Sequence, residues 1–182
     1  MKVGIYAGSF DPFHKGHENI ARRAAAIFDE VIIAIGVHPT KKAVFNVQDR
    51  RVMIERTFTD TDRVTVAAFD SLLVNFVEEL EEHDCHESFY LVRGLRDAHD
   101  FAGESRLAFA NRDIATNQNE TVFILTDPSL SHISSTLIRE LLKYERACFH
   151  YLPDPVADLI EWRREHPGTI LLDNVVREMV SD

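Results

Sequence analysis

The chain has 182 residues, enough for one domain, alone or with an appendage, that buries most of its apolar surface in a single core. Its formal net charge is −10 at pH 7 and its isoelectric point is about 5.3. Nucleic acids and anionic membranes are usually bound by basic surfaces, so this charge argues against both as partners. An anionic ligand has to meet a local cluster of basic side chains.

The cysteine content and the N-terminal residues predict a cytoplasmic protein. The two cysteines, Cys85 and Cys148, form no paired pattern, which is typical of free thiols in a reducing compartment. Residues 1–5 (MKVGI) are typical of a strand and lack the apolar core of a signal peptide. No run of 18 apolar residues occurs, so we expect no membrane-spanning segment.

Strand and helix patterns alternate along the chain, which predicts an α/β fold with a doubly wound, five-stranded parallel sheet. The predicted strands cover residues 3–7, 31–37, 63–69, 89–92 and 121–125, and the predicted helices cover residues 17–28, 47–59, 71–83, 100–114 and about 134–144. Asp70 or Ser71 is the predicted N-cap of the third helix.

Two more helices are predicted beyond the prolines at 153 and 155, over residues 156–164 and 173–180. A Pro-Gly breaker separates them. We therefore divide the chain into an α/β domain over residues 1–152 and a C-terminal helical appendage over residues 153–182, which we expect to pack on the core.

The first functional motif follows the first strand, where residues 8–17 read GSFDPFHKGH. A tight loop that opens a helix presents free N–H groups and a positive dipole end to an anion. Gly8 and Gly16 let the backbone approach closely. His14 and His17 are three residues apart, so a helix that begins near Lys15 places both on one face, within reach of one phosphate.

Other interpretations of this motif remain open at this point. The loop is not a dinucleotide fingerprint, which needs three glycines in the spacing G-x-G-x-x-G. Two histidines at this spacing could ligate zinc, but no third ligand stands at a helical spacing from them, and we predict no metal-ligating residue. The motif could also be only a turn and a helix cap.

Two further segments are expected at the same edge of the sheet. Residues 93–96 (RGLR) follow the fourth predicted strand, and residues 131–139 (SHISSTLIR) follow the fifth strand and open a helix. Ligands of open α/β sheets bind at the carboxyl ends of the strands. Ser134 or Ser135 is the predicted helix cap, and Arg139 one turn later could add a bidentate phosphate contact. Alone this would be a capping motif; together the segments predict one phosphate-binding crevice.

With these motifs, about residues 1–152 resemble the nucleotidyltransferase superfamily, and several stretches resemble the phosphopantetheine adenylyltransferase family within it. Those stretches are residues 8–12 (GSFDP), 39–42 (PTKK), 92–96 (VRGLR), 100–101, 107–108, 111–112 and 121–123. The resemblance implies a Rossmann-like fold and transfer of the adenylyl group of ATP to 4'-phosphopantetheine, which gives dephospho-coenzyme A and pyrophosphate. It also implies Mg²⁺ bound with ATP and a homo-oligomer, a hexamer in the family.

The resemblance assigns roles to matching positions of this chain. The catalytic residues would be His17, His14, Lys41 and Arg93. ATP would be bound by Ser9, Phe10, His17, Gly94, Leu95, Arg96, Glu104, Leu130, Ser131, His132, Ile133, Ser134, Ser135, Thr136 and Arg139, and the acceptor by Ser9, Lys41, Leu73, Arg93 and Asn111. The chain departs from the family's usual residues at His14, Gly103, Leu130, His132, Thr136 and Arg139. Because aromatic residues usually stand at 103 and 130, we expect weaker selection of the nucleobase.

The predicted chemistry needs mainly positioning and charge. A phosphomonoester has a second pKa of about 6, so the acceptor is largely a dianion at pH 7 and needs no general base. Basic side chains and Mg²⁺ would reduce the repulsion between the two substrates. Two alternatives stay open: a nucleotidyltransferase with another acceptor, such as nicotinamide mononucleotide, or with CTP as donor, and a nucleotide-binding sensor that has lost turnover.

Overall fold

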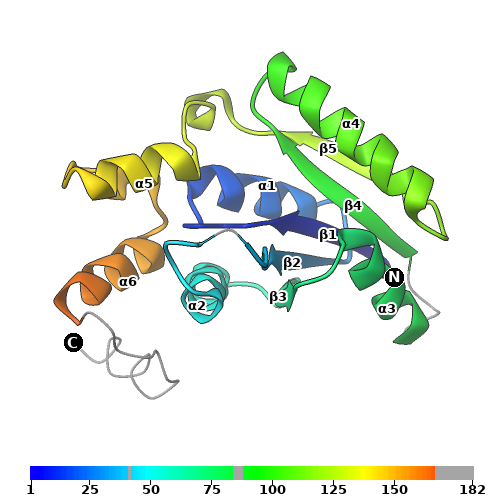
Figure 1. Cartoon of the computed structure of the whole chain (residues 1–182), viewed down its shortest axis with the longest axis horizontal. Coiled ribbons are helices and arrows are strands. Elements are labelled where there is room, and N and C mark those ends of the chain that lie inside the picture. Colours follow the sequence, from blue (N-terminus) through cyan, green and yellow to red (C-terminus); the bar gives the residue numbers. More distant parts are fainter. Residues whose placement is uncertain (41, 84–87, 167–182) are drawn as a thin grey trace.

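The computed structural model describes residues 1–40, 42–83 and 88–166. Its strands are β1 (Lys2–Gly8), β2 (Glu30–Gly36), β3 (Val64–Phe69), β4 (Ser88–Leu95) and β5 (Thr121–Leu125). Its helices are α1 (Lys15–Ala25), α2 (Val47–Thr57), α3 (Leu73–His83), α4 (Ala98–Ile114), α5 (Ser135–Lys143) and α6 (Asp154–Glu165), with short 3₁₀ turns at Pro128–Leu130 and Phe149–Tyr151. The strands form one parallel sheet in the order β3-β2-β1-β4-β5 (Figure 1), which confirms the predicted doubly wound α/β fold.

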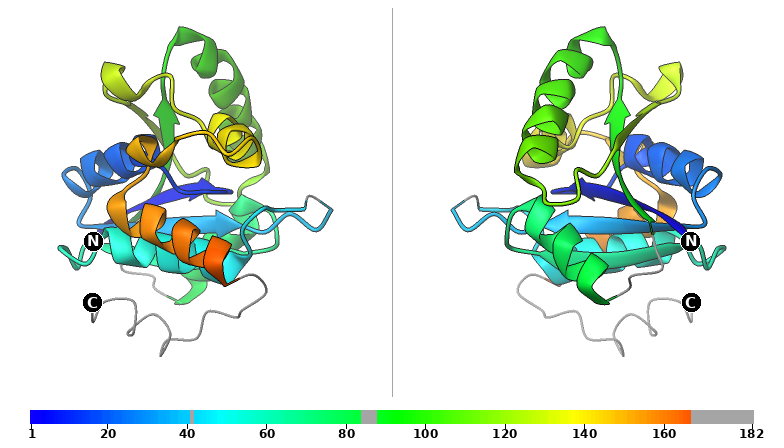
Figure 2. Two further views of the ribbon diagram at one scale, coloured as in Figure 1. Left: turned by 90° about the vertical axis from the view of Figure 1, so that its left-hand side faces the viewer. Right: turned by 90° about the vertical axis from the view of Figure 1, so that its right-hand side faces the viewer.

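Strand alternation divides the core into two layers, one on each face of the sheet. Ile5 of β1 packs with Phe76 and Val77 of α3, whereas Tyr6, the next residue, packs with Ile20 of α1 in the larger layer. Both views of Figure 2 show α1 and α4 on opposite sides of the sheet. No helix in the described part of the chain is both long enough and apolar enough to cross a membrane.

The sheet changes its winding direction between β1 and β4. The chain runs outward from β1 through β2 to β3 at one edge of the sheet. It then returns past β2 and β1 to form β4 and β5 on the other side of β1. β1 and β4 are therefore neighbours, with Tyr6 opposite Val92, although 86 positions separate these residues. Their carboxyl ends diverge into different connections, which is where open α/β sheets leave room for a ligand.

The structure corrects two local predictions. The fourth strand was predicted to end before Arg93, but β4 continues through Leu95 because β5 pairs with it to the end of both strands. The predicted cap of α3 by Asp70 or Ser71 is also wrong. This helix begins at Leu73, where the Leu72 carbonyl accepts from the Phe76 N–H, and the Ser71 hydroxyl donates to that same carbonyl instead of capping a free N–H.

Helix α6 packs along α2 and joins the larger core layer through Val156, Leu159 and Ile160. An ion pair between Arg163 of α6 and Asp49 of α2 adds a polar contact between the two helices. The division of the chain at residue 152 stays a prediction. The helix predicted over 173–180 lies outside the described residues.

Candidate active site

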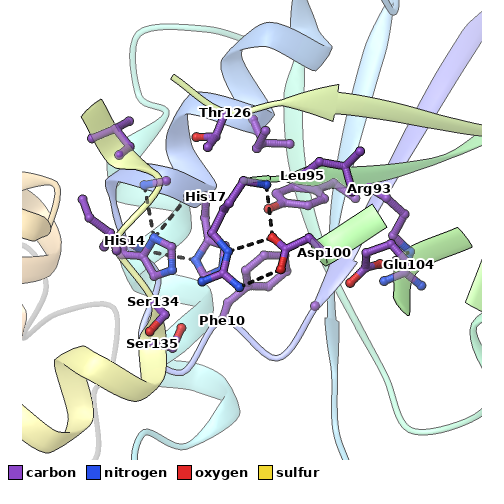
Figure 3. A pocket seen from close by; sticks show the side chains of 18 of the residues that line it. Phe10, His14, His17, Arg93, Leu95, Asp100, Glu104, Thr126, Ser134 and Ser135 are labelled. Atoms are coloured by element: carbon purple, nitrogen blue, oxygen red, sulfur yellow. Dashed lines mark hydrogen bonds and ion pairs between the residues drawn. The ribbon is translucent and has the colours of Figure 1, made fainter. Parts of the chain in front are cut away.

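A cavity of about 320 Å³ opens at the carboxyl ends of β1 and β4 (Figure 3). It lies at the point where the winding direction of the sheet reverses. Its walls come from the β1–α1 loop, the end of β4, the first turns of α4 and the start of α5. The lining residues are Tyr6, Ala7, Gly8, Phe10, His14, Gly16, His17, Ile20, Arg93, Gly94, Leu95, Arg96, Asp100, Glu104, Thr126, Leu130, Ile133, Ser134 and Ser135.

The two histidines form the N-terminal cap of α1. The His14 ring accepts through Nδ1 from the N–H groups of Gly16 (3.1 Å) and His17 (3.3 Å), and His17 Nδ1 accepts from the His14 N–H (3.3 Å). The rings stack with their centroids 3.6 Å apart. A Cβ at Gly16 would lie only 3.0 Å from the His14 ring, so a larger residue would press against that ring. The motif is therefore a helix cap and part of the cavity at once.

These hydrogen bonds fix the tautomer of both histidines. Because Nδ1 accepts in each ring, the proton of the neutral imidazole is on Nε2. Burial, aided by the positive charge of Arg96, lowers the pKa of His14 to about 3. Burial also holds the pKa of His17 well below its ordinary value, and His14 and Arg96 lower it further. Both rings are thus neutral Nε2–H donors at pH 7.

Aromatic packing holds the His17 ring in place. Phe10 meets it edge-on at 5.0 Å between centroids, and Phe13 contacts it at 5.5 Å. Phe10 takes a positive φ of 48°, which is rare for a bulky residue and turns its ring under the loop. A Cβ at Gly8 would lie 2.9 Å from that ring, so the glycine makes room for it. The floor of the cavity is therefore closely packed.

Alternation along β4 sends its residues to opposite sides of the cavity. Gly94 faces α1, where a Cβ would lie 2.9 Å from the Ile20 side chain. Arg93 faces α4, and its Nε lies 3.7 Å from Glu104 Oε2. That carboxylate oxygen is buried and has no hydrogen-bond partner in the part of the chain that the structure describes.

Arg96 is held by a carboxylate of the first turn of α4. Its side-chain Nε and Nη2 donate to the two carboxylate oxygens of Asp100 at 2.9 and 3.0 Å. The main-chain N–H of Arg96 also donates to Asp100 Oδ2. The hydrogen bonds from Arg96 hold the pKa of Asp100 below its ordinary value. In Figure 3, Asp100 and Glu104 point into the cavity from the side opposite Ser134. Both cations of the RGLR segment thus face acidic groups of α4.

The segment of residues 131–139 is hydrogen-bonded directly to the loop of residues 8–17. Ser134 is the N-cap of α5 and accepts from the Leu137 N–H (3.1 Å), as predicted. The Ser135 hydroxyl donates to the Pro12 carbonyl (3.0 Å), and Arg139 Nη1 donates to the Asp11 carbonyl (2.6 Å). The prediction that the two motifs face one crevice is confirmed.

Comparisons with known proteins agree with this geometry. A family model described as cytidylyltransferase-like matches residues 5–141. A phosphopantetheine adenylyltransferase of Fusobacterium nucleatum is 36% identical over 169 residues, which is 92% of this chain and 100% of that protein. The chain belongs to the phosphopantetheine adenylyltransferase family. Other members come from Phocaeicola vulgatus, 40% identical over 85% of this chain and 97% of that protein, and Flavobacterium johnsoniae, 38% identical over 86% and 97%.

Several residues predicted from the family resemblance lie outside the cavity lining. Leu73 packs beside the smaller core layer, and the His132 ring meets Tyr151 edge-on at 5.5 Å. The Ser131 hydroxyl donates to the Pro128 carbonyl. The others are Ser9, Asn111, Thr136 and Arg139, and Lys41 lies outside the described residues. Their binding roles stay predictions.

The two positions where the family usually has an aromatic residue differ in this structure. Leu130 lines the cavity, so a larger side chain there could reach a ligand. Gly103 is exposed, does not line the cavity, and would place a Cβ in open space. The expected weaker selection of the nucleobase therefore depends on Leu130 more than on Gly103.

The cavity is also lined by residues that were not predicted to face a ligand, among them Tyr6, Ile20, Asp100 and Thr126. Two signals were present: Tyr6 is a polar-tipped residue near the end of a buried strand, and Asp100 stands four residues after Arg96, at ion-pair spacing. Burial raises the pKa of Tyr6, so its phenol stays protonated. Thr126 and Ile20 gave no signal of their own, because their position depends on how the strands and helices pack.

Proposed function

We propose that this protein transfers the adenylyl group of ATP to 4'-phosphopantetheine, which gives dephospho-coenzyme A and pyrophosphate. One observation carries this proposal: two neutral imidazoles with fixed Nε2–H donors lie beside two arginines, in the cavity of a chain that belongs to this family. In the reaction, an oxygen of the acceptor phosphate attacks the α-phosphorus of ATP. The bond from that phosphorus to the β-phosphate oxygen breaks, and pyrophosphate leaves.

The histidines suit the stabilisation of charge on the α-phosphate. A donor held rigidly at the point where negative charge develops needs no reorganisation during the reaction. His17 is fixed by its Nδ1 hydrogen bond and by two phenylalanine rings. We assign the transition-state contact to His17, with His14 beside it as a second Nε2–H donor.

The cations of the cavity would neutralise the substrates. We assign Arg93, with Lys41, to the acceptor phosphate and Arg96 to the phosphates of ATP. For that, Arg96 has to exchange its bidentate contact with Asp100 for one with phosphate. Ser134, Ser135 and the N-terminal end of α5 would supply further donors to the phosphates.

Two buried polar atoms on one face of α4, two turns apart, have no hydrogen-bond partner among the residues described, and they support binding sites along this helix. One is Glu104 Oε2 at the cavity wall, which we assign to ATP. The other is Asn111 Nδ2, an amide donor without a hydrogen-bond partner among the residues described. A pantetheine arm carries amide carbonyls that can accept from it. We therefore extend the acceptor site from Arg93 along α4 towards Asn111 and Leu73.

We infer that Mg²⁺ enters with ATP. Mg²⁺ keeps several waters and is usually bound by one or two carboxylates together with substrate phosphates. The Glu104 carboxylate of the cavity wall, whose Oε2 has no hydrogen-bond partner among the residues described, fits such an ion. The bound ion would neutralise charge on the leaving pyrophosphate.

We also infer a cytoplasmic homo-oligomer, a hexamer if the family resemblance extends to assembly. The free, buried thiol of Cys148 suits a reducing compartment, where ATP is available. Helix α4 leaves Phe101, Leu107, Phe109 and Ile114 exposed. Exposed apolar side chains gathered on one helix in this way are typical of a surface that is covered in an assembly.

The test is pyrophosphate release from pure protein with two donors, ATP and CTP, and two acceptors, 4'-phosphopantetheine and nicotinamide mononucleotide. We expect release with ATP and 4'-phosphopantetheine. His17→Asn is the matched control, since its amide oxygen can still accept from the His14 N–H while the Nε2–H donor is lost. Release with nicotinamide mononucleotide alone would overturn the acceptor, and release with CTP alone would overturn the donor. If ATP binds but no pyrophosphate is released in the presence of either acceptor, the protein is a sensor.

A further inference from the structure

Asp11 is buried, with 7% of its surface exposed, yet it is neither a cap of α1 nor part of the cavity lining. Both oxygens of its carboxylate accept main-chain hydrogen bonds from the segment between β2 and α2. Oδ2 accepts from the Val44 N–H at 2.9 Å and Oδ1 from the Phe45 N–H at 2.8 Å. A buried carboxylate is costly unless it is hydrogen-bonded or paired, so these two contacts, together with the nearby positive charge of Arg50, offset the cost of its burial.

The loop that carries Asp11 is itself held from two other elements. Arg50 of α2 donates to the Ser9 carbonyl at 2.7 Å. From α5, Arg139 donates to the Asp11 carbonyl and Ser135 to the Pro12 carbonyl. The backbone around Asp11 is therefore fixed independently of its side chain, and the carboxylate extends from a rigid base.

The partner segment is anchored by its own side chains only at its C-terminal end. Val44 is 61% exposed, so its side chain anchors little. Phe45 is buried in the larger core layer, and Asn46 then caps α2 through the Asp49 N–H. At the junction of the exposed residues 42–44 with this buried end, the two hydrogen bonds to Asp11 join the segment directly to the β1–α1 loop. Arg50 adds a bridge from the Asn46 carbonyl to the Ser9 carbonyl.

We infer that Asp11 is a positioning residue that holds the β2–α2 segment against the β1–α1 loop, and so sets the distance between the acceptor and the histidines. Lys41 precedes Val44 by three residues in the sequence. The inference rests on the proposed function for the identity of the acceptor and for the assignment of Lys41 to its phosphate. It assigns no substrate contact to Asp11, whose effect passes through the main chain of Val44 and Phe45.

The test compares Asp11→Asn with the matched control Asn46→Ala. An asparagine keeps one acceptor and turns an NH₂ group towards the second N–H, so the carboxylate-mediated tie is lost while the backbone contacts of the loop remain. Hydrogen bonds to charged groups contribute enough to predict a rise of about tenfold in the KM of the acceptor. The Kd of ATP, measured by calorimetry without acceptor, should change less than about twofold. Asn46→Ala removes the cap of α2 in the same segment and should lower stability without this split.

Amide hydrogen exchange separates this inference from the proposed function, because it needs no turnover. In Asp11→Asn, peptides that cover residues 42–46 should exchange faster, whereas peptides that cover α1 should not. Unchanged exchange at 42–46 would overturn the inference, even if the enzyme is fully active. Equal weakening of ATP and acceptor, or a KM shift of the same size in Asn46→Ala, would also overturn it. If the wild-type enzyme uses a different acceptor, the KM of that acceptor is the quantity to compare.

Discussion

The two halves of the cavity are built on different principles. In the β1–α1 half, His14 and His17 are fixed by main-chain hydrogen bonds and aromatic packing, and burial keeps them neutral. In the β4–α4 half, Arg93 and Arg96 are held by carboxylates of α4. The first half is in place before any ligand arrives. The second holds its charges in ion pairs that a phosphate can replace.

This difference follows from what each half has to do. Groups that stabilise a transition state act best when they are already oriented, so rigidity is useful around the histidines. Cations that bind a polyanion have to stay hydrated or paired without it, because an unpaired buried charge is costly. Asp100 and Glu104 provide that pairing in the absence of nucleotide. Substitutions in the first half should therefore affect catalysis, and substitutions in the second half should affect ligand binding.

Removal of the His17 donor should have the largest effect. We expect His17→Asn to lower kcat about 100-fold or more while the Kd of ATP changes little, since the contact is assigned to the transition state. Steady-state kinetics and calorimetry measure the two quantities. An equal loss in both would make His17 a ground-state ligand, and a loss of folding, seen by circular dichroism, would make it only a cap.

The buried histidines should make the protein sensitive to acid. An unfolded histidine takes up a proton near pH 6.5, whereas folded His14 does so near pH 3, so unfolding binds protons between these values. Stability should therefore fall as pH falls from about 6.5 towards 3. At pH 5, protonation of His14 in the unfolded chain should lower the free energy of unfolding by about 2 kcal/mol relative to pH 7. Urea unfolding at pH 7 and pH 5 measures this fall.

His14→Asn is the control for that measurement. Asparagine is a good N-cap, and its side-chain oxygen can replace Nδ1 as acceptor from Gly16 and His17. The variant cannot take up a proton at this position, so its stability should fall less between pH 7 and pH 5. An identical fall in both proteins would assign the acid sensitivity to other groups.

Asp100→Asn should leave Arg96 of the β4–α4 half free to bind phosphate without first giving up an ion pair. It removes the charge that holds Arg96, so ATP should bind up to about fivefold tighter, the scale of a partly exposed ion pair. Asp97→Asn is the matched control, because it removes a nearby charge of α4 while an asparagine still caps the helix. Calorimetry measures the Kd of ATP for the wild type and for both variants. Weaker binding in Asp100→Asn would show that Asp100 itself contacts the nucleotide.

The smallest effect is expected at Gly103, on the exposed side of α4. Alanine favours a helix interior over glycine by about 0.5–1 kcal/mol, and the added Cβ meets nothing within 4 Å. Gly103→Ala should therefore raise the melting temperature slightly and leave the Kd of ATP unchanged. A shift in ATP affinity would place residue 103 near the nucleobase.

The local sequence determined the parts of the protein that depend on few neighbours. Alternating apolar runs and helical periods predicted the parallel sheet, because side-chain burial follows those periods wherever the chain packs. The GSFDPFHKGH loop and Ser134 were predictable for the same reason, since a cap acts on N–H groups only two or three residues away.

Only the tertiary structure decided which of several possible partners each polar group and each strand end takes. Arg139 was expected to face phosphate, but its guanidinium donates to the Asp11 carbonyl, 128 residues away. The extension of β4 through Leu95 depends on β5, and the Asp100 carboxylate could have capped α4 instead of holding Arg96. Each of these outcomes is a competition between partners of similar strength. The winner is set by which groups the fold brings within about 3 Å, a quantity that spacing along the sequence does not contain.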